Sequence, residues 1–167
     1  MKLTSTIIAA GFALVLQGAF AGAYANATGG HCTGMTVTDY VSSDVNQSTS
    51  STAWVNITDG QLNFTTPATG CVVVTFSGLA FDSPNTTGVY QYLYVRTLLD
   101  GHNLCVPALT NDTFAAAQLP SPLTATSITR ICKNVAAGAH SIQAQMSVNS
   151  SAGTSYVTGH QLTVTHN

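Results

Sequence analysis

Apolar and polar residues alternate with a period of two along much of the chain, which is the pattern of half-buried strands. In residues 141–148 one alternate set is apolar and the other polar. Residues 89–99 also alternate and end at Asp100-Gly101, a two-residue signal for a type I′ hairpin. The expected partner of that strand is Asn103–Val106.

Other segments favour strands through β-branched and aromatic residues. In the run Cys71–Phe81, apolar residues occupy the positions on both faces of the expected strand, which predicts a central strand buried on both faces. At the C-terminal strand, Tyr156, Leu162 and Val164 are expected to face one way. The remaining predicted strands are Met35–Tyr40, Trp54–Ile57, Gln61–Phe64, Ser127–Val135 and Ser155–His166, with a loop at Pro107–Pro122. Roughly seven to nine strands from Trp54 onward, separated by turn signals, predict an all-β antiparallel sandwich.

The chain divides into three predicted parts. Residues 1–25 are typical of a cleaved signal peptide. They contain Lys2, the apolar run Ile7–Leu16 and small residues that suit cleavage after Ala21 or Ala25. That run is too short to span a bilayer. Residues 26–52 are rich in Gly, Ser and Thr and indicate a polar arm or linker, so the sandwich is expected over residues 53–167. The protein is therefore predicted to be secreted, to the extracellular space, cell surface or periplasm, with no membrane span in the mature chain.

Four cysteines, all after the signal peptide, indicate disulfides in an exported chain: Cys32, Cys71, Cys105 and Cys132. We favour Cys32 with Cys71 and Cys105 with Cys132, because each pair joins sequence neighbours that could lie on adjacent strands. The other two connectivities stay open. A metal site would need short paired spacings such as C-x-x-C, which the sequence lacks.

The segments GCVVVTFSG, YLYVRTLLDG, SITRICKNVAAGAHSIQAQ and QLTVTH follow one another between Gln61 and His166. This order resembles the small secreted bacterial jelly-roll domains related to the complement C1q and tumour-necrosis-factor fold. The resemblance implies a jelly-roll-like sandwich, and such domains commonly trimerise or bind ligands. It transfers no functional residue, and the chain has no collagen-like stem.

Charged residues make up only 6% of the chain. After the signal peptide, three cations (Arg96, Arg130 and Lys133) face six aspartates, which excludes a nucleic-acid partner steered by charge. Seven of the ten asparagines begin Asn-x-Ser/Thr, more than the Ser and Thr content alone predicts: Asn26, Asn46, Asn56, Asn63, Asn85, Asn111 and Asn149. They are candidate glycosylation sites in a glycosylating host, or else turn residues clustered by composition.

Tyr90, Tyr92 and Tyr94 alternate and must share one face of a strand, at about 7 Å intervals. An exposed row of this kind suits sugar stacking or partner docking, whereas a buried row would pack between the sheets. Leu93 and Val95 on the other face compete for the interior. Trp54, the only tryptophan, is expected in the core.

Catalytic and metal-binding patterns are weak. Cys132, His140 and Met146 have spacings unlike a copper loop, and His140 is expected to be a half-buried histidine at the start of a strand. His160 and His166 could form a surface metal site. No nucleophile elbow is present, and the aspartates of Asp59-Gly60 and Asp100-Gly101 belong to turns. We therefore expect no enzyme and no cofactor.

Two functional hypotheses remain. The first is a structural or assembly subunit of the cell surface or extracellular matrix, self-associating through the polar arm or an open sheet edge. The second is an extracellular carbohydrate- or protein-binding module, using the tyrosines or the loops near Pro84 and Pro107–Pro122.

Overall fold

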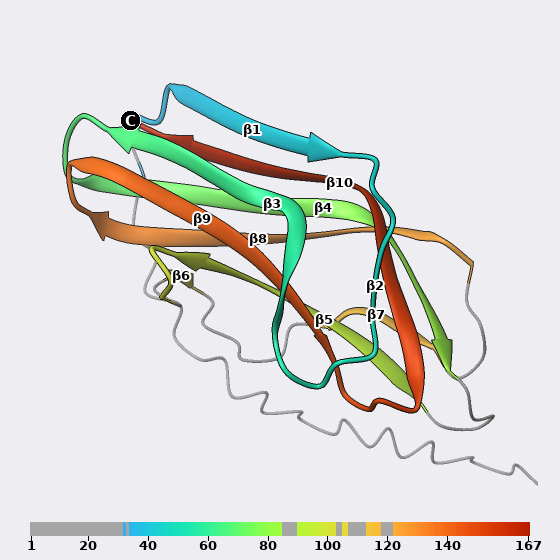
Figure 1. Ribbon diagram of the computed structural model, residues 1–167. Coiled ribbons are helices and arrows are strands. Elements are labelled where there is room, and N and C mark those ends of the chain that lie inside the picture. The colour runs from blue at the N-terminus through green and yellow to red at the C-terminus, as the bar shows by residue number, and fades with distance from the viewer. Residues whose placement is uncertain (1–31, 33, 85–89, 103–104, 107–112, 118–121) are drawn as a thin grey trace, which may run out of the picture. The chain divides into compact units, whose positions relative to one another are not determined.

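Ten strands in two antiparallel sheets make up the described part of the chain (Figure 1). The computed structural model describes residues 32, 34–84, 90–102, 105–106, 113–117 and 122–167. The strands are β1 (Val37–Ser43), β2 (Gln47–Thr49), β3 (Val55–Thr66), β4 (Gly70–Pro84), β5 (Gln91–Leu99), β6 (Cys105–Val106), β7 (Thr113–Ala117), β8 (Thr124–Val135), β9 (Gly138–Val148) and β10 (Gly153–His166). Within these residues there is no helix that could cross a bilayer. The predicted signal peptide lies outside them.

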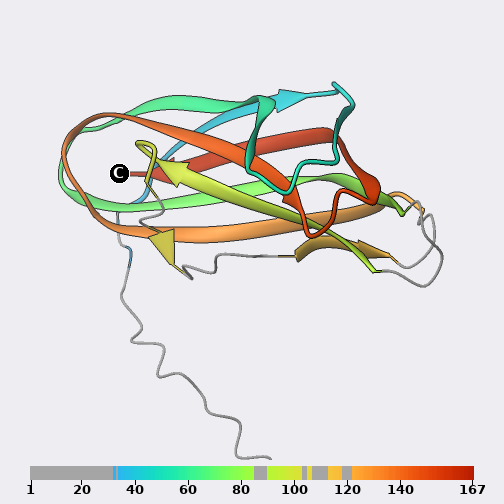
Figure 2. The same cartoon turned by 60° about the horizontal axis from the view of Figure 1, so that its bottom comes forward.

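The two sheets have the orders β1-β10-β4-β8-β6 and β3-β9-β5-β7, with β2 also paired to β10. Without the short strands β2 and β6, each sheet has four strands. In both sheets, strands from early and late parts of the chain lie side by side, as in a jelly roll. Figure 2 shows the same strands from a second direction. The predicted all-β sandwich is confirmed, with eight of the described strands after Trp54.

The core lies between the sheets and is filled by alternate residues of the long strands. Phe76, Leu93, Ile142 and Leu162 have no exposed surface. Burying a side chain of this size contributes roughly 1.5–3 kcal/mol. The alternating pattern of residues 141–148 therefore points its apolar set into the sandwich, as predicted.

Strand β4 has one buried face instead of the two that its apolar run predicted. Val72, Val74 and Phe76 are fully buried, whereas Val73 is partly exposed and Leu79 is 38% exposed. β4 is central within its sheet, between β10 and β8. The prediction was wrong because each sheet of a two-layer sandwich has only one covered face.

The sheet begins at Val37, which corrects the expected domain start near Ala53. β1 pairs with β10 over its whole length, and β2 pairs with residues 155–157 of β10. The Gln47 side chain also accepts a hydrogen bond from Thr58 N–H and donates one to the Asn56 carbonyl, so β2 is joined to β3 in the other sheet. The polar composition of residues 26–52 suggested an arm, but β1 and β2 form backbone hydrogen bonds with the edge of β10.

The hairpin turn at Asp100-Gly101 has the predicted type I′ geometry, with φ of 51° and 78°. The prediction that Asn103–Val106 pairs with β5 is wrong for the two residues of that segment that the structure describes. Only an isolated bridge joins Leu99 to His102, and Cys105 and Val106 form β6, which pairs with β8 in the other sheet. The chain therefore leaves β5 and crosses between the sheets.

A bulge between Thr158 and Gln161 corrects the predicted facing of β10. Val157 and Leu162 are buried, whereas Tyr156 is partly exposed and its ring stacks on Phe81 with centroids 4.3 Å apart. The inserted residue reverses the alternation, so Tyr156 faces away from Leu162.

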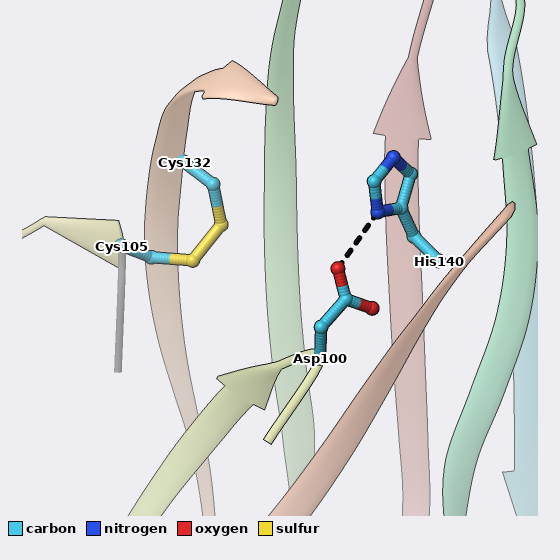
Figure 3. Close-up of a disulfide and its surroundings, with 4 residues drawn as sticks. All are labelled: Asp100, Cys105, Cys132 and His140. Atoms are coloured by element: carbon cyan, nitrogen blue, oxygen red, sulfur yellow. Dashed lines mark hydrogen bonds and ion pairs between the residues drawn. A yellow bond between two sulfur atoms is a disulfide. The ribbon is translucent and has the colours of Figure 1, made fainter. Parts of the chain in front are cut away.

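Both favoured disulfides are present, Cys32–Cys71 and Cys105–Cys132. Cys105 lies opposite Cys132 in the β6–β8 pairing (Figure 3). β6 is only two residues long, and this bridge links it covalently to β8.

Candidate functional site

The tyrosine row lies on the outer face of the β3-β9-β5-β7 sheet. Along β5, Gln91, Leu93 and Val95 are buried, and the residues between them are partly exposed. Of the two alternatives that the sequence left open, the structure therefore shows the exposed one. Aliphatic side chains fill the interior without an unmet hydrogen bond, whereas a buried tyrosine needs a partner for its hydroxyl.

The three rings are nearly parallel. The ring centroids of Tyr90 and Tyr92 are 5.8 Å apart with planes at 18°, and those of Tyr92 and Tyr94 are 6.2 Å apart with planes at 11°. Tyr90 is 50% exposed. Opposite Tyr92 on β7 is Ala116, and opposite Tyr94 on β9 is Ser147. Ala116 is exposed and leaves room beside the Tyr92 ring, whereas Ser147 is itself covered, with 3% of its surface exposed.

Asn149 holds the beginning of the row. Its Oδ1 accepts a hydrogen bond from the Tyr92 N–H (2.8 Å), and its Nδ2 donates one to the Tyr90 carbonyl (2.9 Å). The side-chain amide thus pairs with the backbone as a neighbouring strand would. The sequence singled out Asn149 only as a candidate glycosylation site and gave no sign of this role.

Arg96 and Trp54 form the other end of the row. Arg96 is the next outward residue after Tyr94, and its guanidinium carbon lies 4.2 Å from the centroid of the Trp54 ring. Trp54 is partly exposed, so its predicted place in the core is wrong. The residue lies just before β3, where the cation–π contact with Arg96 offers an alternative to burial.

A chain of hydrogen bonds extends from Arg96 across the sheet. Arg96 Nε donates to Gln145 Oε1, and Gln145 Nε2 donates to Asn56 Oδ1, both at 2.8 Å. These residues lie opposite one another on β5, β9 and β3. The aromatic row is thus bordered by ordered amide groups that can bond to sugar hydroxyls.

The four described candidate glycosylation sites are all exposed: Asn46, Asn56, Asn63 and Asn149. On β3, Asn56 and Asn63 are each followed by a buried residue and then an exposed threonine. An Asn-x-Thr triplet arises naturally on a strand whose outer face is polar, which accounts for part of their abundance. Asn26, Asn85 and Asn111 lie outside the described residues.

A second polar cluster lies at one end of the sandwich. His140 Nδ1 is 2.8 Å from Asp100 Oδ2, and His140 Nε2 is 2.8 Å from the Ala136 carbonyl (Figure 3 shows the Asp100 contact). Both partners accept hydrogen bonds, so a doubly protonated ring satisfies them best. The hydrogen bond to Asp100 raises the pKa of His140 despite partial burial. The half-buried position predicted for His140 is confirmed, with 11% of its side chain exposed.

Asp100 is fully engaged in this cluster. Burial opposes ionisation, but hydrogen bonds from His140 and from the Ser141 N–H (2.8 Å) outweigh it and lower the pKa of Asp100. An open pocket of about 420 Å³ lies against Asn63, Asp100 and His140. The polar atoms of Asp100 and His140 already have partners, so this pocket offers a ligand less than the aromatic row does.

The described residues contain no group of three His, Cys, Asp or Glu side chains that could hold a metal. Cys132 is in a disulfide, so it is not a copper ligand. His160 and His166 are 1% and 2% exposed, which contradicts a surface metal site. His160 stacks on Phe76, and His166 contacts Asp39 Oδ2 through Nε2 at 2.9 Å.

No protein-family model matches this chain, and no curated protein matches it in sequence.

Proposed function

We propose that this protein is a secreted binding module whose tyrosine row recognises carbohydrate. The observation that carries the proposal is the outward position of Tyr90, Tyr92 and Tyr94 as three nearly parallel rings. A row of rings on a strand follows an extended ligand, and sugar rings present apolar C–H faces that stack on aromatic surfaces.

The surroundings of the row also suit a glycan. Gln145 and Asn56 supply amide groups beside it, and Ala116 and Ser147 are too small to cover the neighbouring rings. Polar groups at the edge of an aromatic surface fix ligand orientation. A protein partner would use the same surface through its own apolar side chains and is the alternative that the experiment below separates.

Two disulfides are compatible with an extracellular protein. The signal-peptide pattern of residues 1–25 supports export. A binding module is also compatible with the resemblance to small secreted bacterial jelly-roll domains, which commonly trimerise or bind ligands.

A structural or assembly role is the second candidate. Within the described residues, β1 pairs only with β10, and Val37 and Tyr40 on it are 42% and 66% exposed. Such an edge can accept a strand from another copy. The arm proposed for this purpose is, however, partly used within its own chain, because β1 and β2 already pair with β10.

Binding to a glycan array, followed by isothermal titration calorimetry on the hits, tests the proposal. Tyr92→Ala removes the central ring and should weaken binding roughly two- to tenfold, since a ring contact contributes about 0.5–1.5 kcal/mol. Tyr40→Ala, an exposed tyrosine on the other sheet, is the matched control and should bind normally. The proposal fails if no glycan binds, or if both variants bind like the wild type.

Light scattering distinguishes the assembly role. A monomer at all concentrations would exclude self-association through β1. Concentration-dependent oligomers that disappear when Tyr40 is replaced by lysine would favour it over the binding role.

A further inference from the structure

Arg96 is a cation that has no acidic partner within the part of the chain that the structure describes. The ion pairs of Asp100 with His140 and of Asp39 with His166 do not involve Arg96. Arg96 has the Trp54 ring and the Gln145 amide as its contacts. Burial lowers the pKa of Arg96, because the charged guanidinium loses part of its hydration. An anion at this position would offset that cost.

The guanidinium is held in one place. Trp54 covers one of its faces, and Nε is fixed by Gln145, which is itself bonded to Asn56. The two terminal nitrogens form no hydrogen bond with the described residues. They point their N–H groups in the guanidinium plane, in the arrangement that binds a carboxylate through two parallel hydrogen bonds.

Arg96 is also positioned along the tyrosine row. It follows Tyr94 at the next outward place on β5, about 7 Å away along the strand. A sugar stacked over Tyr94 would therefore bring its substituents, or those of the next sugar, within reach of the guanidinium.

We propose that the tyrosine row binds acidic glycans, in which the carboxylate of a sugar pairs with Arg96. This inference rests on the proposed glycan-binding function and specifies its ligand class. The rings bind the faces of the sugars, and Arg96 selects those that carry a carboxylate. The chain is net acidic, so the selection arises from close pairing and not from long-range attraction of a polyanion.

Matched ligands isolate the carboxylate. Oligogalacturonate and its methyl ester share a backbone and differ in charge, and sialyllactose and lactose differ by the acidic sugar. Binding is followed by calorimetry and by the emission of Trp54, which is the only tryptophan and touches Arg96. The wild type should bind at least one acidic member about tenfold or more tightly than its neutral counterpart, as expected for a charge-assisted hydrogen-bonded pair.

Variants of Arg96 show whether it makes the selection. Arg96→Gln should bring the acidic and neutral members to equal affinity. Arg96→Lys keeps the charge without the planar fork, and should retain only part of the preference. Lys133→Gln removes an exposed cation from β8 in the other sheet and should leave the preference unchanged.

The outcomes separate this inference from the proposed function. Equal wild-type affinity for both members of each pair, or a preference that survives in Arg96→Gln, overturns the role of Arg96. Binding to neutral glycans alone, with loss in Tyr92→Ala, overturns the acidic ligand and leaves glycan binding intact. Absence of binding to any glycan overturns both. If Arg96→Gln unfolds, Arg96→Lys and the methyl ester still test the pairing.

Discussion

The pair formed by His140 and Asp100 should make the stability of the sandwich depend on pH. His140 joins three parts of one end of the fold: its own strand β9, the β5 turn through Asp100, and the β8–β9 connection through the Ala136 carbonyl. We consider His140→Gln, which removes the titrating ring and its charge. The change should destabilise the protein most when His140 is protonated.

The magnitude follows from the two contacts of the ring. A hydrogen bond to a charged group contributes about 1.5–3 kcal/mol when well enclosed. The Asp100 side chain is 43% exposed, so solvent screens its attraction. We therefore expect the whole cluster to contribute only about 1–2 kcal/mol to the free energy of unfolding.

The sign is set by the direction of the two shifts. The pKa of His140 is raised in the folded state, so its contribution is complete below the unfolded value of about 6.5 and disappears as pH rises through the folded value. The pKa of Asp100 is lowered, so its contribution is present above about 3.8 and disappears as pH falls through the folded value. Both are present between about pH 4 and 6.5.

Urea unfolding at pH 5.5 and pH 9, followed by circular dichroism, measures the effect. The difference in unfolding free energy between wild type and His140→Gln should be largest at pH 5.5 and decrease at pH 9. Asp100→Asn keeps a residue that tolerates the positive φ of this turn and removes the charge, so it completes a double-mutant cycle. A difference that is the same at both pH values would refute the reasoning.

Three further predictions concern the framework of the site. Replacing Cys105 and Cys132 by alanine should lower the unfolding free energy by about 3.5 kcal/mol from the closed-loop entropy, measured by urea unfolding of the variant against the oxidised wild type. Gly101→Ala should cost about 1–2 kcal/mol because φ is 78° there, and an unchanged thermal midpoint would contradict this. Asn149→Ala removes both side-chain hydrogen bonds to the backbone of Tyr90 and Tyr92 and should reduce the free energy of unfolding by about 1–2 kcal/mol. It should also weaken glycan binding by displacing Tyr90, and normal affinity would show that the row does not need this support.

The candidate site was only partly predictable from sequence. The alternation placed Tyr90, Tyr92 and Tyr94 on one face, because side chains on a strand alternate whatever surrounds them. It did not show which face is outside, since Leu93 on the other face is also apolar. The partner of Arg96 was also hidden, because Trp54 lies far from it along the chain and meets it only across the folded sheet.

The sequence by itself determined the fold class and the type I′ turn at Asp100-Gly101, since these depend on local periodicity and backbone preference. It favoured the two disulfide pairs that the structure contains but left the other connectivities open. Only the tertiary structure decided that β1 and β2 complete the β10 edge, that β6 joins the opposite sheet from β5, and that the bulge in β10 turns Tyr156 outward. The physical reason is that strand pairing and register are set by hydrogen bonds and burial between segments distant in sequence, which no local pattern contains.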